Sequence, residues 1–347
     1  MKALIVGPPT AERGALASQA REEGYAVETA ISGSDALASL RNEAFDLVLL
    51  AAPLPDMEAR QFFKAAAALG QRRSRDVESL THEMDVARNI QRDFLPESLP
   101  LAPGIQLEAV LNPARQVSGD FYDAFPLPPS DTVVLVVGDV CDKGVGAALF
   151  MALFRSLIRA SADPVQGGAI QMIGGRRTIV RQSIESATPA DLLTRVAGFT
   201  NDYIARLHGR TNMFATVFLG VLDPGTGRLD YVNAGHEPAL VVAPDGGIRE
   251  LRPTGPALGL MPDQVFRAAQ TTLDARQALV AFTDGLVEAR SMAGEVFGAG
   301  RLRDALRANC GSAKTLVRGV VDTLQAFTGQ AEPHDDVTLL AASRPDA

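Results

Sequence analysis

The sequence is poor in cysteine, has no excess of positive charge and contains no long hydrophobic run. Cys141 and Cys310 are the only cysteines, which excludes a disulfide framework or a zinc site of paired cysteines and favours a reducing, cytoplasmic location. A formal net charge of -8 argues against nucleic acid as a partner, because such binding depends on basic residues that neutralise phosphates. No apolar run approaches the roughly 20 residues that span a bilayer, so we expect neither a signal peptide nor a membrane partner.

The apolar residues that are present suffice for more than one core. Hydrophobic residues make up 46% of the chain and charged residues 21%, which is ordinary for a globular protein. The 347 residues exceed the roughly 250–300 at which a single core stops growing. We therefore divide the chain into a small unit at 1–56, a helical linker at 57–96 and a larger domain at 97–347. A cluster of three prolines at 96–103 supports the second boundary, because proline ends a helix.

The N-terminal segment alternates short apolar runs with helical spacing. The runs at 2–6, 25–30 and 45–50 are typical of strands, and residues 10–23 and 34–42 have the spacing of helices. Strands and helices in alternation predict a small α/β unit with parallel strands.

The linker is almost free of glycine and proline and is rich in Ala, Arg, Glu and Gln. Steps of three and four residues give it a short heptad-like seam, formed by Val77, Leu80, Met84, Ala87, Gln91 and Phe94. Arg73 and Gln91 interrupt this seam. Two interpretations stay open: the helix pairs with its copy in a homodimer, or it packs on its own domain.

The larger domain is rich in strands that follow one another like hairpins. Strands are expected near 105–111, 117–125, 132–139, 214–222, 228–234, 239–243, 279–283 and 336–342. Long helices are expected near 144–161, 189–207, 299–309 and 313–328. This arrangement predicts an α+β sandwich. Residues 162–187, with two GG pairs and a basic run, interrupt the pattern and are interpreted as a mobile surface flap.

Aspartates stand at the ends of apolar strands in four segments, 117–125, 133–149, 278–289 and 334–342. Carboxylates that meet at the rim of a sheet repel one another and lose hydration unless cations neutralise them. Hard oxygen ligands without a His or Cys cluster indicate Mg²⁺ or Mn²⁺ rather than zinc. A pair of such ions activates water and stabilises a transferring phosphoryl group, so the acids suggest metal-assisted phosphate hydrolysis. Any one of these aspartates alone would more simply be a turn residue.

The blocks SGDFYD, GDVCDKGVGAALFMA, NAGHEPAL, GPALGL, TDGLVEA, FGAGRL and HDDVTLL make the chain resemble the SpoIIE/RsbU branch of the type 2C (PPM) protein phosphatases. The resemblance covers roughly residues 83–342. It implies an α/β sandwich of two antiparallel sheets flanked by helices, with a di-manganese or di-magnesium centre. It also implies hydrolysis of phosphoserine or phosphothreonine in a bacterial regulatory protein, such as an anti-sigma-factor antagonist. The competing interpretation is an inactive pseudophosphatase that binds a partner through the same surface.

Carried over residue by residue, the resemblance assigns the catalytic metals to side chains of all four segments. The implied ligands are Asp120, Asp139, Asp284, Asp335 and the backbone carbonyl of Val140. Asp139 is expected to bridge the two ions.

Other residues of these blocks are expected to support the ligands. Asp336 replaces Asp335 as a ligand if the register slips by one, and Asp123 is expected to support the site or the fold. Gly119, Gly144 and Gly285 would let the backbone approach the metals, because glycine has no Cβ.

The histidines and one arginine are assigned with alternatives. His236 in the NAGHEP block, which also contains Asn233 and Gly235, is expected to hold the framework by hydrogen bonds. His334 either orients the following pair of acids or lies in a solvated loop. Arg115 is offered as a phosphate ligand, with an ordinary surface arginine as the alternative.

One residue departs from the pattern of the eukaryotic relatives. They have a histidine two residues after the bridging aspartate, where this chain has Cys141. The resemblance then implies that water at the metals protonates the leaving group.

The N-terminal segment resembles the first half of a response-regulator receiver. Receivers have acids after the first strand and a phosphorylatable aspartate after the third, where this chain has Gly7, Pro8 and Ala51. The resemblance implies a truncated pseudo-receiver for dimerisation or for binding an upstream regulator, or else a vestigial cap. Residues 83–96 resemble the switch helix that precedes this phosphatase branch and controls assembly of the metal centre.

Overall fold

The computed structural model describes residues 1–51, 53–162, 168–173, 176–181 and 188–346, with the backbone alone described at 70–81, 168–173 and 176–181. The chain divides into two compact units, Met1–Glu83 and Met84–Ala347.

The first unit is a small parallel α/β layer structure. Its strands β1 (Lys2–Val6), β2 (Ala26–Ala30) and β3 (Leu47–Leu50) pair in the order β2-β1-β3, with helices α1 (Ala11–Glu22) and α2 (Gly33–Asn42) between them in sequence. The central strand is buried on both faces, since Leu4 and Val6 pack in one hydrophobic cluster and Ala3 and Ile5 in another. The predicted parallel α/β unit is therefore present.

Gly7 and Ala51 approach each other at the carboxyl edge of this sheet. Gly7 has a φ of +148°, and a Cβ on it would lie 2.1 Å from the carbonyl oxygen of Ala51. Two of the three positions that carry acids in receivers are thus neighbours in space. Kinship of this unit with receivers remains a prediction.

A single helix, α3 (Ala59–Phe94), occupies most of the segment predicted to be helical, and its residues up to Glu83 belong to the first unit. The division of the chain at 56 and 96 remains a prediction. Phe62 of α3 is buried in the first unit, and Gln91 of α3 is buried in the second. The side chains of Val77 and Leu80 lie outside the described residues, so the heptad seam remains a prediction.

The second unit contains two five-stranded antiparallel sheets. The first has the order β13-β10-β9-β6-β5 and the second β12-β11-β14-β15-β4. Strands of the first sheet are β5 (Phe121–Pro126), β6 (Val133–Val140), β9 (Ala215–Leu222), β10 (Arg228–Ala234) and β13 (Ala269–Thr272). Strands of the second are β4 (Gln106–Asn112), β11 (Ala239–Val242), β12 (Ile248–Leu251), β14 (Ala278–Phe282) and β15 (Val337–Ser343).

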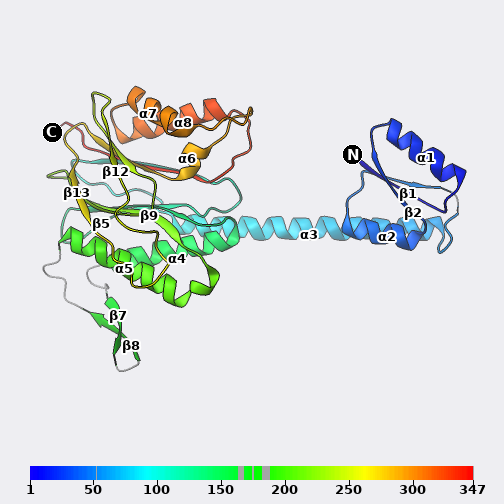
Figure 1. The fold of residues 1–347 in the computed structure, drawn as a ribbon, viewed down its shortest axis with the longest axis horizontal. Coiled ribbons are helices and arrows are strands. Elements are labelled where there is room, and N and C mark those ends of the chain that lie inside the picture. Colours follow the sequence, from blue (N-terminus) through cyan, green and yellow to red (C-terminus); the bar gives the residue numbers. More distant parts are fainter. Residues whose placement is uncertain (52, 163–167, 174–175, 182–187, 347) are drawn as a thin grey trace. The chain divides into compact units, whose positions relative to one another are not determined.

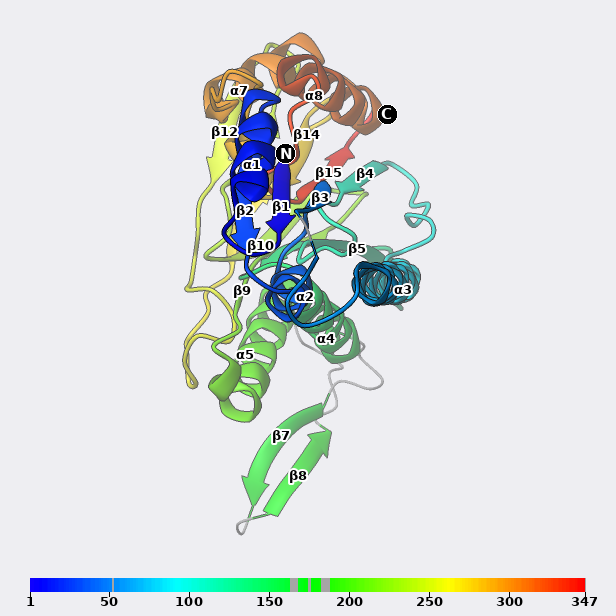
Figure 2. The ribbon, with the colours of Figure 1, turned by 90° about the vertical axis from the view of Figure 1, so that its right-hand side faces the viewer.

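Helices cover the outer face of each sheet, as Figures 1 and 2 show for this unit. Helices α4 (Val145–Ala162) and α5 (Pro189–Leu207) pack on the first sheet, and α6 (Asp284–Glu288), α7 (Gly298–Ala308) and α8 (Ala313–Thr328) on the second. A short 3₁₀ turn (Gly209–Thr211) follows α5. A third hydrophobic cluster lies between the two sheets. The predicted α+β sandwich is confirmed.

Strand β6 shows how the sequence builds this sandwich. Val134 and Val136 belong to the cluster under α4 and α5, whereas Val133, Leu135 and Val137 belong to the cluster between the sheets. Because side chains alternate between the faces of a strand, a strand buried on both faces is apolar at every position.

Short elements escaped the sequence prediction. Strands β12 (IREL) and β13 (AQTT) lack an apolar run, and α6 with five residues is too short for a helical pattern. Two further paired strands, β7 (Gly168–Ile173) and β8 (Arg176–Arg181), lie in the predicted flap, whose mobility remains a prediction.

Among the described helices, α4 alone is long and apolar enough to span a membrane. Its Met151, Phe154 and Ile158 are buried in the core on the first sheet. A core helix explains its composition.

Candidate metal centre

The alternation of side chains places two acids between the sheets at one end of the sandwich. Asp139 shares the inward-facing parity of Leu135 and Val137 on β6. Asp120 directly precedes β5, on the same parity as Ala124, which lies in the cluster between the sheets. Asp120 is only 2% exposed.

Two threonines from the opposite sheet hold the carboxylate of Asp120. The hydroxyls of Thr283 and Thr338 each donate to Oδ2 of Asp120, both at 2.7 Å. Thr283 follows β14 and Thr338 lies in β15. Asp120 therefore has one fixed orientation, although burial and the nearby Asp139 carboxylate raise its pKa well above the ordinary value.

Asp139 is the electrostatic centre of the acids. Burial, followed by the charges of Asp284 and Asp335, raises the pKa of Asp139 to about 7, and a hydrogen bond with Asp120 opposes the rise. The hydrogen bonds agree with this, because Thr283, which bonds Asp120, directly precedes Asp284, and Asp336, which bonds Gly119, directly follows Asp335. The four acids therefore lie at the same end of the sandwich.

Asp284 is the first residue of α6, two residues after the end of β14. Burial raises the pKa of the Asp284 carboxyl, and the charges of Glu288 and Asp335 raise it further. Burial and the charge of Asp284 also raise the pKa of Glu237. Sequence reasoning did not single out either glutamate.

Asp335 is engaged at both of its oxygens. Its Oδ1 accepts a hydrogen bond from the backbone N–H of Asp336 at 2.9 Å, and its Oδ2 lies 2.7 Å from Nζ of Lys143. Lys143 also donates to the carbonyl oxygen of His334 at 2.8 Å. The charge of Lys143 lowers the pKa of Asp284, opposing the rise caused by burial.

Asp336 faces the backbone instead. Its Oδ1 accepts from the N–H of Ala114 at 2.7 Å and its Oδ2 from the N–H of Gly119 at 2.8 Å. Both oxygens thus hold the loop that carries Asp120. This geometry favours Asp335 over Asp336 for contact with a metal.

Two of the three glycines allow close approach between backbone segments, while their role beside metals remains a prediction. A Cβ on Gly119 would lie 3.0 Å from the carbonyl oxygen of Val140, and a Cβ on Gly285 would lie 2.0 Å from that of Asp336. Gly144 has open space around it but a φ of +86°, so its turn requires the glycine.

The donor set fits Mg²⁺ or Mn²⁺, because it consists of carboxylates and the Val140 carbonyl. Burial and mutual repulsion make these charges costly in the absence of a cation, as the raised pKa values of Asp120 and Asp139 show. Among the described residues, however, no three acidic, His or Cys groups are close enough to enclose an ion. The acids converge without forming a closed ligand shell, and Thr, Lys and backbone groups contact several of their oxygens.

Asp123 lies on the other face of β5. Its carboxylate pairs with Arg155 and Arg159 of α4, at 3.0 Å in each case, and is 1% exposed. Alternation explains the separation, because Asp123 and the inward-facing Asp120 differ by an odd number of residues. Asp123 therefore ties α4 to the sheet.

The NAGHEP block supports the site from β9 and β10. Nδ1 of His236 lies 2.8 Å from Oγ1 of Thr216, the residue paired with Asp139 in the sheet. The side chain of Asn233 accepts from the N–H of His236 at 2.8 Å. Burial lowers the pKa of His236 to about 4, so the ring is neutral. This geometry agrees with a framework role.

The remaining candidates lie at the margin of the site. Sγ of Cys141 accepts from the N–H of Phe214 at 3.2 Å, and burial raises the pKa of the thiol. Arg115 is exposed on the loop before Asp120. His334 is exposed and contributes its carbonyl to Lys143, whereas its ring makes no hydrogen bond with the described residues.

Sequence reasoning missed Thr283, Thr338 and Lys143. Thr283 directly precedes Asp284, and Thr338 follows Asp336 by two residues. Both threonines have the inward-facing parity of their strands, so the alternation of side chains could have identified them. Lys143 stands in the GDVCDKG block, but only the fold brings it to Asp335.

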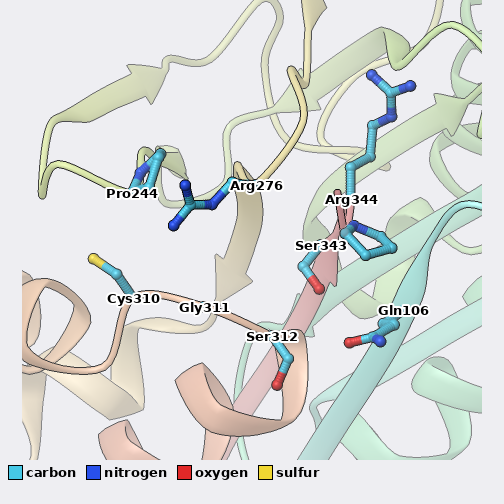
Figure 3. Close-up of a pocket in the computed structure, with 9 residues that line it drawn as sticks. Gln106, Pro244, Arg276, Cys310, Gly311, Ser312, Ser343 and Arg344 are labelled. Carbon is cyan, nitrogen blue, oxygen red and sulfur yellow. The ribbon is translucent and has the colours of Figure 1, made fainter. Parts of the chain in front are cut away.

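A pocket of about 250 Å³ lies away from the acids, lined by residues that include Gln106, Arg276, Cys310 and Ser343 (Figure 3). Ser343 ends β15, whereas Asp335 precedes its start, so an extended chain separates them by roughly 25 Å. The pocket and the acids therefore occupy opposite ends of the sandwich.

A sequence model of the family Stage II sporulation protein E (SpoIIE) matches residues 129–345. Protein IcfG of Synechocystis sp. is 42% identical over 267 residues, which make up 76% of this chain and 41% of IcfG. Phosphoserine phosphatase RsbU of Bacillus subtilis is 24% identical over 271 residues, 77% of this chain and 71% of RsbU. The match thus spans 41% of the length of IcfG and 71% of the length of RsbU.

Solved structures share the fold. The RsbU and RsbW domains of Rv1364c from Mycobacterium tuberculosis match with a TM-score of 0.54 and 28% identity, covering 73% of this chain and 64% of that one. The SiaA-PP2C domain of Pseudomonas aeruginosa matches with a TM-score of 0.60 and 22% identity, covering 78% of this chain and 99% of that one. The sandwich is therefore a PP2C-type (PPM) fold.

Proposed function

Because this chain belongs to the SpoIIE family, we propose that it is a metal-dependent phosphatase that removes phosphate from serine or threonine of a bacterial regulatory protein. The single observation that supports this most is the convergence of Asp120, Asp139, Asp284 and Asp335 at one end of a PP2C-type sandwich. The similarity to RsbU, a phosphoserine phosphatase, supports the same reaction.

We assign the four aspartates and the Val140 carbonyl as ligands of two divalent cations, Mn²⁺ or Mg²⁺. When bound, these ions supply a nucleophilic water and neutralise charge on the transferring phosphoryl group. The central position of Asp139 among the other acids supports a ligand shared by both ions.

The surrounding residues position these ligands. Thr283 and Thr338 fix Asp120, and Asp336 holds the loop before it through the N–H groups of Ala114 and Gly119. Such outer contacts matter because a ligand bound in one orientation needs no reordering when the cation arrives.

Cys141 is not assigned as the acid for the leaving group. Its pKa is raised and its sulfur already accepts a hydrogen bond from Phe214 N–H. Proton delivery is therefore left to water, and Arg115 remains the candidate that meets the substrate phosphate from the loop before Asp120.

We further propose that the N-terminal unit serves dimerisation or binds an upstream regulator in the cytoplasm. The lack of acids at Gly7, Pro8 and Ala51 supports a role without phosphorylation of that unit. Phosphorylated regulators of the anti-sigma-factor-antagonist type are the proposed substrates.

Hydrolysis of an aryl phosphate with and without Mn²⁺ tests the activity. Activity that disappears on chelation and in Asp139→Asn supports the enzyme. The substrate is then sought by pull-down with Asp284→Asn, followed by identification of phosphopeptides. Folded protein that stays inert with metal and with a panel of phosphoproteins would instead indicate a pseudophosphatase that binds its partner.

A further inference from the structure

We propose that Lys143 is an internal counter-ion that occupies Asp335 in place of a divalent cation and is displaced when metal binds. The inference rests on the proposed metal centre and adds a residue to it. It starts from the contact of 2.7 Å between Nζ of Lys143 and Oδ2 of Asp335.

The contact engages the only oxygen of Asp335 that the backbone leaves open. Oδ1 accepts from the N–H of Asp336, and Oδ2 faces the ammonium of Lys143. A divalent cation at Oδ2 would lie beside a like charge within a few ångströms, where repulsion is strong. Metal and ammonium therefore compete for this carboxylate.

The backbone around Lys143 is shaped to present its side chain. Asp142 and Gly144 on either side have φ values of 72° and 86°, a left-handed conformation on both flanks. The side chain of Asp142 accepts from the N–H of Lys143 at 2.8 Å, and the ammonium also donates to the carbonyl of His334. Lys143 thus ties the loop after β6 to the loop before β15, and both loops carry proposed ligands.

The exposure of the pair indicates that displacement is reversible. The side chains of Lys143 and Asp335 are 35% and 28% exposed. Partly exposed ion pairs are weak, so removing Lys143 should strengthen metal binding about three- to tenfold rather than by orders of magnitude.

The test follows lysine reactivity in the whole chain, which has four lysines, Lys2, Lys64, Lys143 and Lys314. The protein is acetylated with and without Mn²⁺, and each site is quantified by mass spectrometry. Lys143 should react several-fold faster with Mn²⁺, because its ammonium leaves Asp335. Lys2 is an internal control, since it is paired with Glu43 in the first unit. An unchanged or slower rate at Lys143 would overturn the inference.

Calorimetry of Mn²⁺ binding gives an independent measurement. Lys143→Met should bind Mn²⁺ about three- to tenfold more tightly than the wild type, while Lys143→Arg and the exposed control Lys314→Met should match it. Equal or weaker binding by Lys143→Met refutes the counter-ion while leaving the metal centre intact. A wild type that binds no Mn²⁺ would refute the metal centre itself, and the inference with it.

Discussion

The side-chain amide of Gln91 forms two hydrogen bonds with the backbone of Ser118. Nε2 of Gln91 donates to the Ser118 carbonyl at 2.6 Å, and Oε1 accepts from the Ser118 N–H at 2.9 Å. Gln91 belongs to α3, and Ser118 lies two residues before Asp120. The end of α3 is thereby fastened to the loop that carries a proposed metal ligand, which accounts for a polar residue at this position of the predicted seam.

Replacing Gln91 by Leu should weaken metal binding and activity together. The change leaves the N–H and carbonyl of Ser118 unpaired in a buried place, which costs about 1–3 kcal/mol and loosens the loop before Asp120. We expect Mn²⁺ affinity to fall about 10–100-fold, as for loss of other outer contacts at metal sites. The measurement is calorimetric titration with Mn²⁺.

Ile90→Gln is the matched control, because Ile90 is 55% exposed on the same helix. Its Mn²⁺ affinity should equal that of the wild type. If Gln91→Leu behaves like this control, the helix is not coupled to the site through Ser118.

Removing the two threonine hydroxyls should release Asp120 from its fixed orientation. In Thr283→Val with Thr338→Val, the carboxylate loses both donors at Oδ2, and we expect phosphatase activity to fall about 10–100-fold.

Asp123→Asn is the contrasting change, because it breaks the buried pairs with Arg155 and Arg159 on the helix side. It should cost up to about 3–5 kcal/mol of stability while Mn²⁺ affinity stays at the wild-type level. Loss of metal affinity in Asp123→Asn would show that its role is misassigned.

Metal binding should depend on pH around neutrality. The pKa of Asp139 is about 7 without metal, so below pH 7 a bound proton has to leave before a cation can bind. Apparent Mn²⁺ affinity should therefore fall by up to about tenfold for each pH unit below 7 and level off above it. Calorimetry in buffers of different ionisation enthalpy measures the released proton. Affinity that is flat from pH 6 to pH 8 would contradict this.

Burial of His236 should make the fold sensitive to mild acid. The pKa of His236 is about 4 in the folded chain, against 6.5 as its ordinary value. Between these values the unfolded chain binds a proton that the folded chain does not, so stability falls as pH drops from 6.5 to 4. The loss amounts to about 2–4 kcal/mol.

Chemical denaturation of the wild type and His236→Gln across this pH range isolates the effect. Carboxyls such as Asp139, whose pKa values are raised, act in the opposite direction but do so in both proteins. The wild type should therefore lose more stability than His236→Gln as pH falls. Equal slopes would mean that His236 does not titrate as its burial requires.

Hydrophobic periodicity predicted the long strands and helices, because a long buried element leaves a regular apolar pattern in the sequence. The apolar run of β6 and the helical spacing of α4 and α5 depend on local burial alone. The short strands β12 and β13 have no such apolar pattern, because they are defined by the strands with which they pair.

For the proposed site, the sequence predicted the acidic residues but not the contacts that surround them. Aspartates at strand ends pointed to one edge, and alternation along β5 already separates Asp120 from Asp123. The ion pair of Lys143 with Asp335 joins residues that are far apart in the chain, so no local sequence pattern encodes it. The contact of α3 with the loop before Asp120 was equally hidden, because it depends on one glutamine and the backbone of a distant loop.

The central claim is that distant aspartates converge to bind two cations. A crystal of the whole chain grown with Mn²⁺, with diffraction data collected at the manganese absorption edge, tests it most directly. Our account predicts two anomalous peaks roughly 3.5–4 Å apart, with Asp139 touching both and Asp120, Asp284 and Asp335 completing the ligands. Saturating Mn²⁺ with no peak among these four side chains would contradict it.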